Sequence, residues 1–247
     1  MELFVQSPWK GKKVAFLGDS ITDKCHVGTT KNYWQFLAET LGIEPLVYGI
    51  NGDNWAGVKK QAERLKADYG NSVDAISIFA GTNDYMGGLP IGEWYEIKDE
   101  SVNLWGKERV LPRRHFVMTE TTFRGRINAA LSYIKAEFVD QQVFIVTPIH
   151  RAFATFSAEN VQPEETFPNA LGLYVDQYVD VLREASGIWS VPLIDLHSLC
   201  GLYPLLPAHS KYFHDSATDL LHPSAEGHRR MAKVMAAQML ALPSDFK

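Results

Sequence analysis

A serine follows an apolar run near the beginning of the sequence. Val14–Leu17 are all apolar, and Gly18, Asp19 and Ser20 follow directly. Glycine, aspartate and serine are common in turns and helix caps, so this stretch fits an ordinary turn. The alternative is that Ser20 is a nucleophile held at the end of a buried strand. Nucleophilic catalysis by serine also requires a base, an acid that orients the base, and donors to an oxyanion.

A candidate base and its acid lie near the other end of the sequence, in DLLHP. Asp219 precedes His222 in this block, and Pro223 follows. Proline disfavours the helical conformation for the residue before it and suits the first turn of a helix, so we expect His222 on a loop where a helix begins. The carboxylate of Asp219 can then reach Nδ1–H of His222 and stabilise the imidazolium that forms when the ring takes the serine proton. A capped helix start without catalytic function explains the same pattern.

Candidate donors to an oxyanion are found in two further segments. Asn83 follows an apolar run in FAGTNDY, and its side-chain amide is a suitable donor to the negative oxygen formed during acyl transfer. Gly52, in YGINGDNWAG, lets a backbone N–H approach a substrate with no side chain between them. Both segments also fit simple turns, because Asn-Gly and Asn-Asp are turn-forming pairs.

The order of apolar and amphipathic segments predicts one α/β domain that spans residues 1–247. Short apolar runs alternate with helical periodicity, as in residues 127–138. Such alternation is typical of a parallel sheet with helices on both faces. Three consecutive strands then end near Ser20, Gly52 and Asn83, at the same edge of the sheet. The expected strands are Val14–Leu17, Leu46–Ile50, Ala75–Ala80, Val143–Pro148 and Val191–Leu196.

Four short blocks, in the order GDSIT, NG, GTND and DLLHP, resemble the four sequence blocks of the SGNH (GDSL-type) hydrolases. They extend from Gly18 to Pro223, which is nearly the whole chain. The resemblance implies a three-layer α/β/α sandwich with a flavodoxin-like, five-stranded parallel sheet. It also implies a serine esterase or acylhydrolase that acts on esters, thioesters or acylated sugars.

The resemblance further implies a role for each matching residue. Ser20 takes the place of the nucleophile, and Asp219 and His222 take the places of its triad partners. Gly52, Asn83 and the backbone N–H of Ser20 take the places of the oxyanion donors. GDSIT differs from GDSL at its fourth position, which varies within the family. The G-x-S-x-G elbow of the α/β-hydrolases is absent, and the close spacing of Asp219 and His222 favours the SGNH arrangement.

Residues 85–122 interrupt the alternation directly after the third expected strand. Ligands of open parallel sheets bind beyond the carboxyl ends of the strands, so we expect this insertion to form a lid or wall of the site. Trp94 and Trp105 within it either stack on a sugar ring or simply pack the segment. His150 and Arg151 follow the fourth expected strand at the same edge, where they either contact substrate or form a surface salt bridge.

The composition argues against several classes of protein. The chain has 247 residues, 46% of them hydrophobic, and a formal net charge of −5. It has no basic block typical of a nucleic-acid partner and no apolar run long enough to span a membrane. Cys25 and Cys200 suggest neither a disulfide framework nor a metal site, and we expect no cofactor. The start lacks a signal peptide, so we expect a cytoplasmic protein, or a secreted or periplasmic one if a signal peptide has been removed.

We therefore expect a serine hydrolase that cleaves short-acyl esters, acetyl above all, of a carbohydrate or another polar alcohol. The alternatives are a carbohydrate-binding protein that does not use its triad, and a lipase or thioesterase that prefers longer acyl groups. A nucleotide-dependent oxidoreductase would need a G-x-G-x-x-G turn after the first strand, and that turn is absent. A metal-dependent phosphoesterase would need carboxylates and histidines at several strand ends, and Asp219 and His222 alone meet this requirement. No pattern indicates an oligomeric state.

Overall fold

The computed structural model describes residues 7–242 and 246 of the chain. Its centre is a five-stranded sheet in which all neighbouring strands are parallel. The strands follow the flavodoxin-like order, in which the second strand of the chain lies at one edge beside the first. The predicted α/β/α sandwich is thus confirmed. In spatial order the strands are β2 (Glu44–Val47), β1 (Lys13–Gly18), β3 (Ala75–Phe79), β6 (Gln142–Val146) and β9 (Leu193–Ile194).

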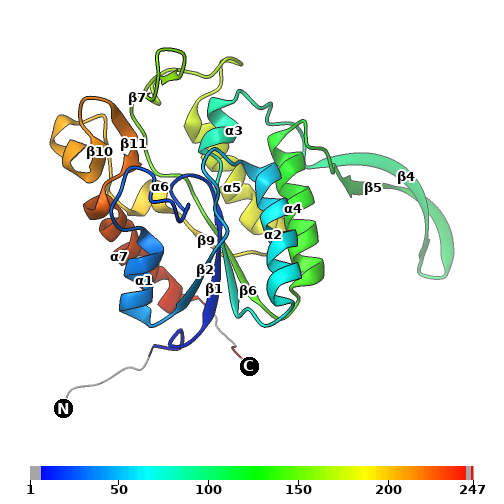
Figure 1. The fold of residues 1–247 in the computed structure, drawn as a ribbon. Helices are drawn as coiled ribbons and strands as arrows, with labels where there is room; N and C mark the ends of the chain where they lie inside the picture. Colours follow the sequence, from blue (N-terminus) through cyan, green and yellow to red (C-terminus); the bar gives the residue numbers. More distant parts are fainter. Residues whose placement is uncertain (1–6, 243–245, 247) are drawn as a thin grey trace.

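Helices cover both faces of the sheet (Figure 1). One face carries α2 (Trp55–Tyr69), α4 (Phe123–Glu137) and α5 (Val175–Trp189), and the other carries α1 (Tyr33–Leu41), α6 (Leu196–Leu199) and α7 (Ala225–Ala241). Successive side chains of a strand point to opposite faces. In β1, Ala15 and Leu17 enter the first core, and Val14 and Phe16 enter the second. Burial on both faces explains the uninterrupted apolar run of β1.

Short elements complete the edge at which the strands end. Helix α3 (Thr82–Met86) begins just after β3, and a short 3-10 helix, η1 (Pro207–Tyr212), precedes β10. A small antiparallel sheet joins β10 (Phe213–Asp215), β11 (Asp219–Pro223), β7 (Ala154–Thr155) and β8 (Val161–Gln162), in that order. In Figure 1, α3, β7 and β11 lie toward the same end of the molecule. In the part of the chain that the structure describes, no helix is long and apolar enough to cross a membrane.

The insertion contains a two-stranded hairpin, β4 (Tyr95–Leu104) and β5 (Lys107–Phe116). Trp105 and Gly106 form its turn with φ angles of 53° and 75°, as the tight turns favoured in hairpins require. The hairpin extends away from the layers on the side of α2 and α4, and not over the edge with α3 and β11 (Figure 1). This position differs from the lid that the sequence suggested for residues 85–122.

The base of the hairpin explains its direction. Trp94 is buried there, and its Nε1 donates to Oε2 of Glu184 on α5 at 2.7 Å. Phe116 stacks on Trp189 of the same helix, with ring centroids 4.4 Å apart. Trp105, in contrast, is 93% exposed at the tip. Of the two alternatives for these residues, packing describes Trp94, and the two indoles do not form one platform, because Trp105 stands at the far end of the hairpin.

Candidate active site

Ser20, His222 and Asp219 form a continuous chain of hydrogen bonds. Nε2 of His222 lies 2.9 Å from Oγ of Ser20, and Nδ1 of His222 lies 2.8 Å from Oδ2 of Asp219. Ser20 lies in the turn after β1, whereas Asp219 and His222 lie in β11 and not on the loop that the sequence suggested. All three residues are buried. The geometry lets His222 accept the proton of Ser20 while Asp219 accepts Nδ1–H.

Three donors hold the carboxylate of Asp219. Its Oδ1 accepts the N–H groups of Leu221 and His222, both at 3.0 Å, and its Oδ2 accepts the ring of His222. Burial by itself raises the pKa of Asp219, but these hydrogen bonds outweigh it, and the pKa lies below its usual value. Asp219 is therefore ionised at neutral pH and acts as an acceptor. This fixes the imidazole proton on Nδ1 and points the lone pair of Nε2 at Ser20.

Candidate oxyanion donors gather at the ends of the first three strands. Nδ2 of Asn83 donates one hydrogen bond to the carbonyl of Asp53 at 2.7 Å, which leaves its second N–H. Gly52 faces open space, since a Cβ placed on it would have no neighbour within 4 Å. Within residues 7–242 and 246, the backbone N–H groups of Ser20 and Gly52 have no acceptor. These groups are able to donate to the oxygen of a ligand.

Gln61 joins the loops that carry Ser20 and Gly52. Its Oε1 accepts the N–H of Gly18, and its Nε2 donates to the carbonyl of Gly18 and to Oδ2 of Asp53, each at 2.8 Å. Gly18 is the last residue of β1, directly before the turn that carries Ser20, and Asp53 follows Gly52, so Gln61 fixes the two segments relative to each other. The sequence reading missed this residue. Its signal was a glutamine on the otherwise apolar, buried face of α2.

Arg151 links α3 to β8 from a buried position. Its Nη1 donates to Oγ1 of Thr82 at 3.2 Å, and its Nη2 donates to Oε1 of Gln162 at 2.7 Å. Burial lowers the pKa of Arg151 to about 10, so it stays charged at neutral pH. A side chain that is 1% exposed fits neither a surface salt bridge nor direct contact with substrate. Arg151 instead holds Thr82, and with it the start of the helix that carries Asn83.

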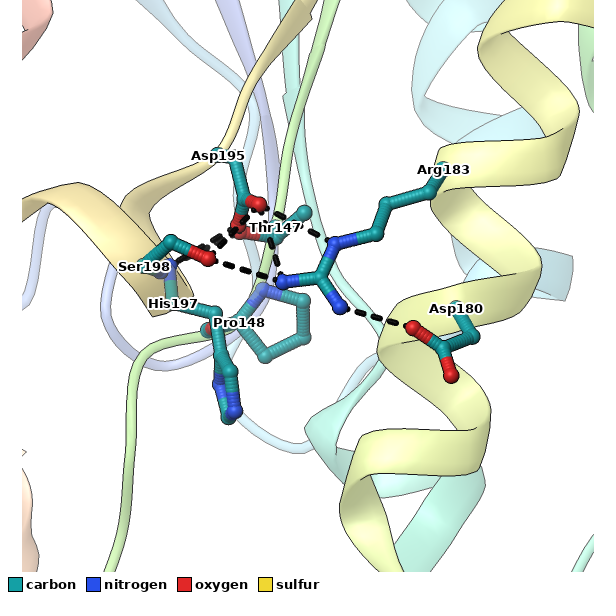
Figure 2. Close-up of polar contacts among 7 residues, drawn as sticks. All are labelled: Thr147, Pro148, Asp180, Arg183, Asp195, His197 and Ser198. Atoms are coloured by element: carbon teal, nitrogen blue, oxygen red, sulfur yellow. Dashed lines mark hydrogen bonds and ion pairs between the residues drawn. The ribbon is translucent and has the colours of Figure 1, made fainter.

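His150 belongs to a polar network at the ends of β6 and β9. Its Nδ1 lies 2.6 Å from Oε1 of Glu165, and its ring centroid lies 3.7 Å from that of His197. The backbone N–H of His197 donates to Oγ1 of Thr147, which in turn donates to Asp195 (Figure 2). These contacts hold His150 beside Glu165 and His197, at the edge of the sheet where the strands end. His150 is not part of the hydrogen-bonded chain of Ser20, His222 and Asp219.

Asp19, next to Ser20, is a buried carboxyl group. Its Oδ1 accepts the N–H of Ile21 at 3.1 Å. Burial, together with the nearby carboxylates of Asp84 and Asp53, raises the pKa of Asp19 from 3.8 to about 7. Between these two pH values the folded state binds a proton that the unfolded state has released. The contribution of Asp19 to stability is therefore full below the lower value and is lost as pH rises through the higher one.

We expect Asp19→Asn to remove this dependence on pH, because the amide keeps an acceptor for Ile21 but does not ionise. In wild type, the free energy of unfolding falls by up to about 1.4 kcal/mol per pH unit through this group. Urea denaturation at about pH 5 and about pH 8 measures the effect. The free energy of unfolding of the variant, relative to that of wild type, should be higher at about pH 8 than at about pH 5. An equal difference between the two proteins at both pH values contradicts the assignment.

Comparisons with known proteins agree with this geometry. The model of the GDSL-like lipase/acylhydrolase family matches residues 16–230. A crystal structure from Lactobacillus plantarum is similar with a TM-score of 0.72 and 24% identity, over 94% of this chain and 98% of that one. A possible lipase from Chitinophaga pinensis is similar with a TM-score of 0.67 and 20% identity, over 94% of this chain and 99% of that one. The acetyl xylan esterase AlAXEase is similar with a TM-score of 0.57 and 19% identity, over 92% of this chain and 98% of that one. No curated protein gives a significant match.

The residues matched by the family model include all four sequence blocks, from the strand before Ser20 to the helix after His222. The similar structures share the parallel sheet and its flanking helices. Family and fold thus agree over most of the chain. The chain belongs to the GDSL-like lipase/acylhydrolase family and is a hydrolase of the esterase class.

Proposed function

We propose that the protein hydrolyses carboxylic esters through a covalent acyl-enzyme on Ser20. The observation that supports this most strongly is the hydrogen-bonded chain from Oγ of Ser20 through His222 to Asp219. A hydroxyl hydrogen-bonded to an imidazole nitrogen, with the ring itself oriented by an ionised carboxylate, is an activated nucleophile.

In the first half of the reaction, Oγ of Ser20 attacks the ester carbonyl carbon while Nε2 of His222 takes the hydroxyl proton. The carbonyl oxygen becomes an oxyanion that accepts hydrogen bonds from the N–H groups of Ser20 and Gly52 and from Nδ2 of Asn83. The bond to the alcohol oxygen then breaks, and the imidazolium gives its proton to the leaving alkoxide. A water molecule repeats these steps on the acyl-enzyme, releases the carboxylic acid and restores Ser20.

For the substrate we propose a short acyl group, acetyl above all, on a carbohydrate or another polar alcohol. The similarity to an acetyl xylan esterase supports this choice. The similarity to a possible lipase favours the alternative of longer acyl groups. The hairpin β4–β5 does not enter this argument, because it extends away from the edge with α3 and β11 (Figure 1). A carbohydrate-binding protein without catalysis is disfavoured, since the serine, histidine and aspartate are all present and in contact.

A series of p-nitrophenyl esters, from acetyl through butyryl and octanoyl to dodecanoyl, tests the acyl preference. We expect the highest kcat/KM for the acetyl ester and a steady fall with chain length, and we expect acetylated xylo-oligosaccharides to be substrates. Ser20→Ala is the control for hydrolysis that does not depend on the site. A maximum at octanoyl or above contradicts the short-acyl proposal. Binding of the acetylated sugar without hydrolysis of any ester indicates the binding protein instead.

A further inference from the structure

Phe156 flanks the imidazole of His222. Their ring centroids lie 5.5 Å apart at an interplanar angle of 57°. Phe156 follows directly after β7, and β7 pairs with β11 through Ala154 and Asp219. This pairing holds the aromatic ring beside the catalytic chain. The Phe156 side chain is nevertheless 45% exposed, so it is available to a ligand.

His222 marks the side of the site on which the alcohol of an ester lies. Its protonated Nε2 gives a proton to the oxygen of the leaving alcohol, so this oxygen must come within hydrogen-bond reach of Nε2. The candidate donors to the carbonyl oxygen come from the ends of β1, β2 and β3 instead. An exposed side chain that touches the imidazole therefore lies beside the alcohol and not beside the acyl group.

Two other parts of the protein pack against His222. Asp219 covers Nδ1. The loop at Gly28 packs against the base of the side chain, since a Cβ on Gly28 would lie 2.6 Å from Cβ of His222 and 3.1 Å from Cβ of His214. The φ of Gly28 is +70°, a conformation that glycine adopts without steric cost. Phe156 is, in contrast, an exposed neighbour of the ring, so a ligand that reaches His222 beside it also meets the phenyl group.

We propose that Phe156 is the platform for the alcohol half of the substrate, and that a pyranose ring stacks on it. This inference rests on the proposed esterase function and assigns recognition of the sugar to one side chain. The apolar face of a sugar ring suits an aromatic face, and its hydroxyl groups need polar neighbours. Exposed polar residues are present in the same small sheet and its loops: Asn160, whose carbonyl accepts the N–H of Phe156, and His214 in β10, which pairs with the strand of His222.

The test varies the alcohol and the acyl group independently. The kcat/KM of wild type and Phe156→Ala is measured on ethyl acetate, ethyl butyrate, and the acetyl and butyryl esters of methyl xylopyranoside. We expect the variant to lose about tenfold on both sugar esters and less than about twofold on both ethyl esters, because one stacking contact is removed. Phe156→Tyr keeps the aromatic face and should retain wild-type values on all four.

Phe167→Ala is the matched control. Phe167 lies on the segment between β8 and α5, is 56% exposed, and makes no ring contact with His222 among the described residues. We expect Phe167→Ala to have the same kcat/KM as wild type on all four esters. Phe156→Leu keeps the apolar bulk without the aromatic face, and we expect it to show the same selective loss on the sugar esters. It takes the place of Phe156→Ala in the test if Phe156→Ala does not fold.

Three results overturn the platform. An equal loss on ethyl and sugar esters means that Phe156 supports the imidazole and does not bind the alcohol. A loss of kcat/KM that differs between acetyl and butyryl esters, whatever the alcohol, places Phe156 beside the acyl group. If kcat/KM falls on none of the four esters, Phe156 does not bind the substrate. Failure of the esterase proposal itself has a different signature, because wild type would then hydrolyse none of the four esters.

Discussion

Ser20→Ala is expected to lower kcat for ester hydrolysis by about 10⁴-fold or more while the fold stays intact. Without Oγ, His222 has no serine hydroxyl to deprotonate, so no acyl-enzyme can form at residue 20. Among the residues that the structure describes, the hydroxyl makes one hydrogen bond, to His222, so its loss should cost only about 1 kcal/mol of stability. The checks are the steady-state rate on p-nitrophenyl acetate and the midpoint of thermal unfolding.

Ser198 offers a matched control for this substitution. Its Oγ donates to Oδ2 of Asp195 at 2.9 Å, in the network of Figure 2 and outside the hydrogen-bonded chain of Ser20. We expect Ser198→Ala to retain kcat. The double variant Ser20→Ala, His222→Ala should be no slower than Ser20→Ala, because residues that act as one unit are not additive. Residual activity of Ser20→Ala above about a hundredth of wild type would exclude Ser20 as the nucleophile.

The central strands are predictable because burial on both faces leaves a direct mark in the sequence. The apolar runs Val14–Leu17 and Ala75–Ala80 come within one residue of the bounds of β1 and β3. The last strand is shorter than the run Val191–Leu196 suggests. Asp195 accepts the N–H of Ser198 and caps α6, so a helix begins where the apolar pattern still continues.

The parts of the site that depend on long-range pairing are not predictable in this way. The sequence predicts His222 on a loop because Pro223 follows it, whereas the structure places it in β11. The partner strands β7 and β10 are only two and three residues long, so they leave no hydrophobic period in the sequence that would reveal the pairing. Gln61 and Phe156 reach the site from outside the four sequence blocks. The direction of the hairpin depends on how Trp94 and Phe116 pack on α5, and this packing leaves no local pattern.

Asn83→Ala is expected to lower kcat by about 10²–10³-fold with a smaller effect on KM. The charge on the substrate oxygen develops only as the carbonyl carbon becomes tetrahedral, so a donor aimed at that oxygen stabilises the transition state more than the bound ester. The backbone donors at Ser20 and Gly52 remain in the variant, which is why activity falls without vanishing. Asn83→Asp, with nearly the same volume but no donor, should be at least as slow as Asn83→Ala.

A structural role for Asn83 has to be separated from this electrostatic one. Nδ2 of Asn83 also holds the carbonyl of Asp53, so truncation releases the loop that carries Gly52. A boronic acid that adds to Oγ of Ser20 presents a negatively charged tetrahedral centre to the donors, whereas acetamide presents a neutral, planar carbonyl group. If Asn83 acts on the oxyanion, the boronate should bind more weakly by about the same factor as kcat falls, and acetamide should bind nearly as in wild type. Equal weakening of both ligands would mean that Asn83 shapes the loop, and a raised KM with unchanged kcat would make it a residue that binds the ground state.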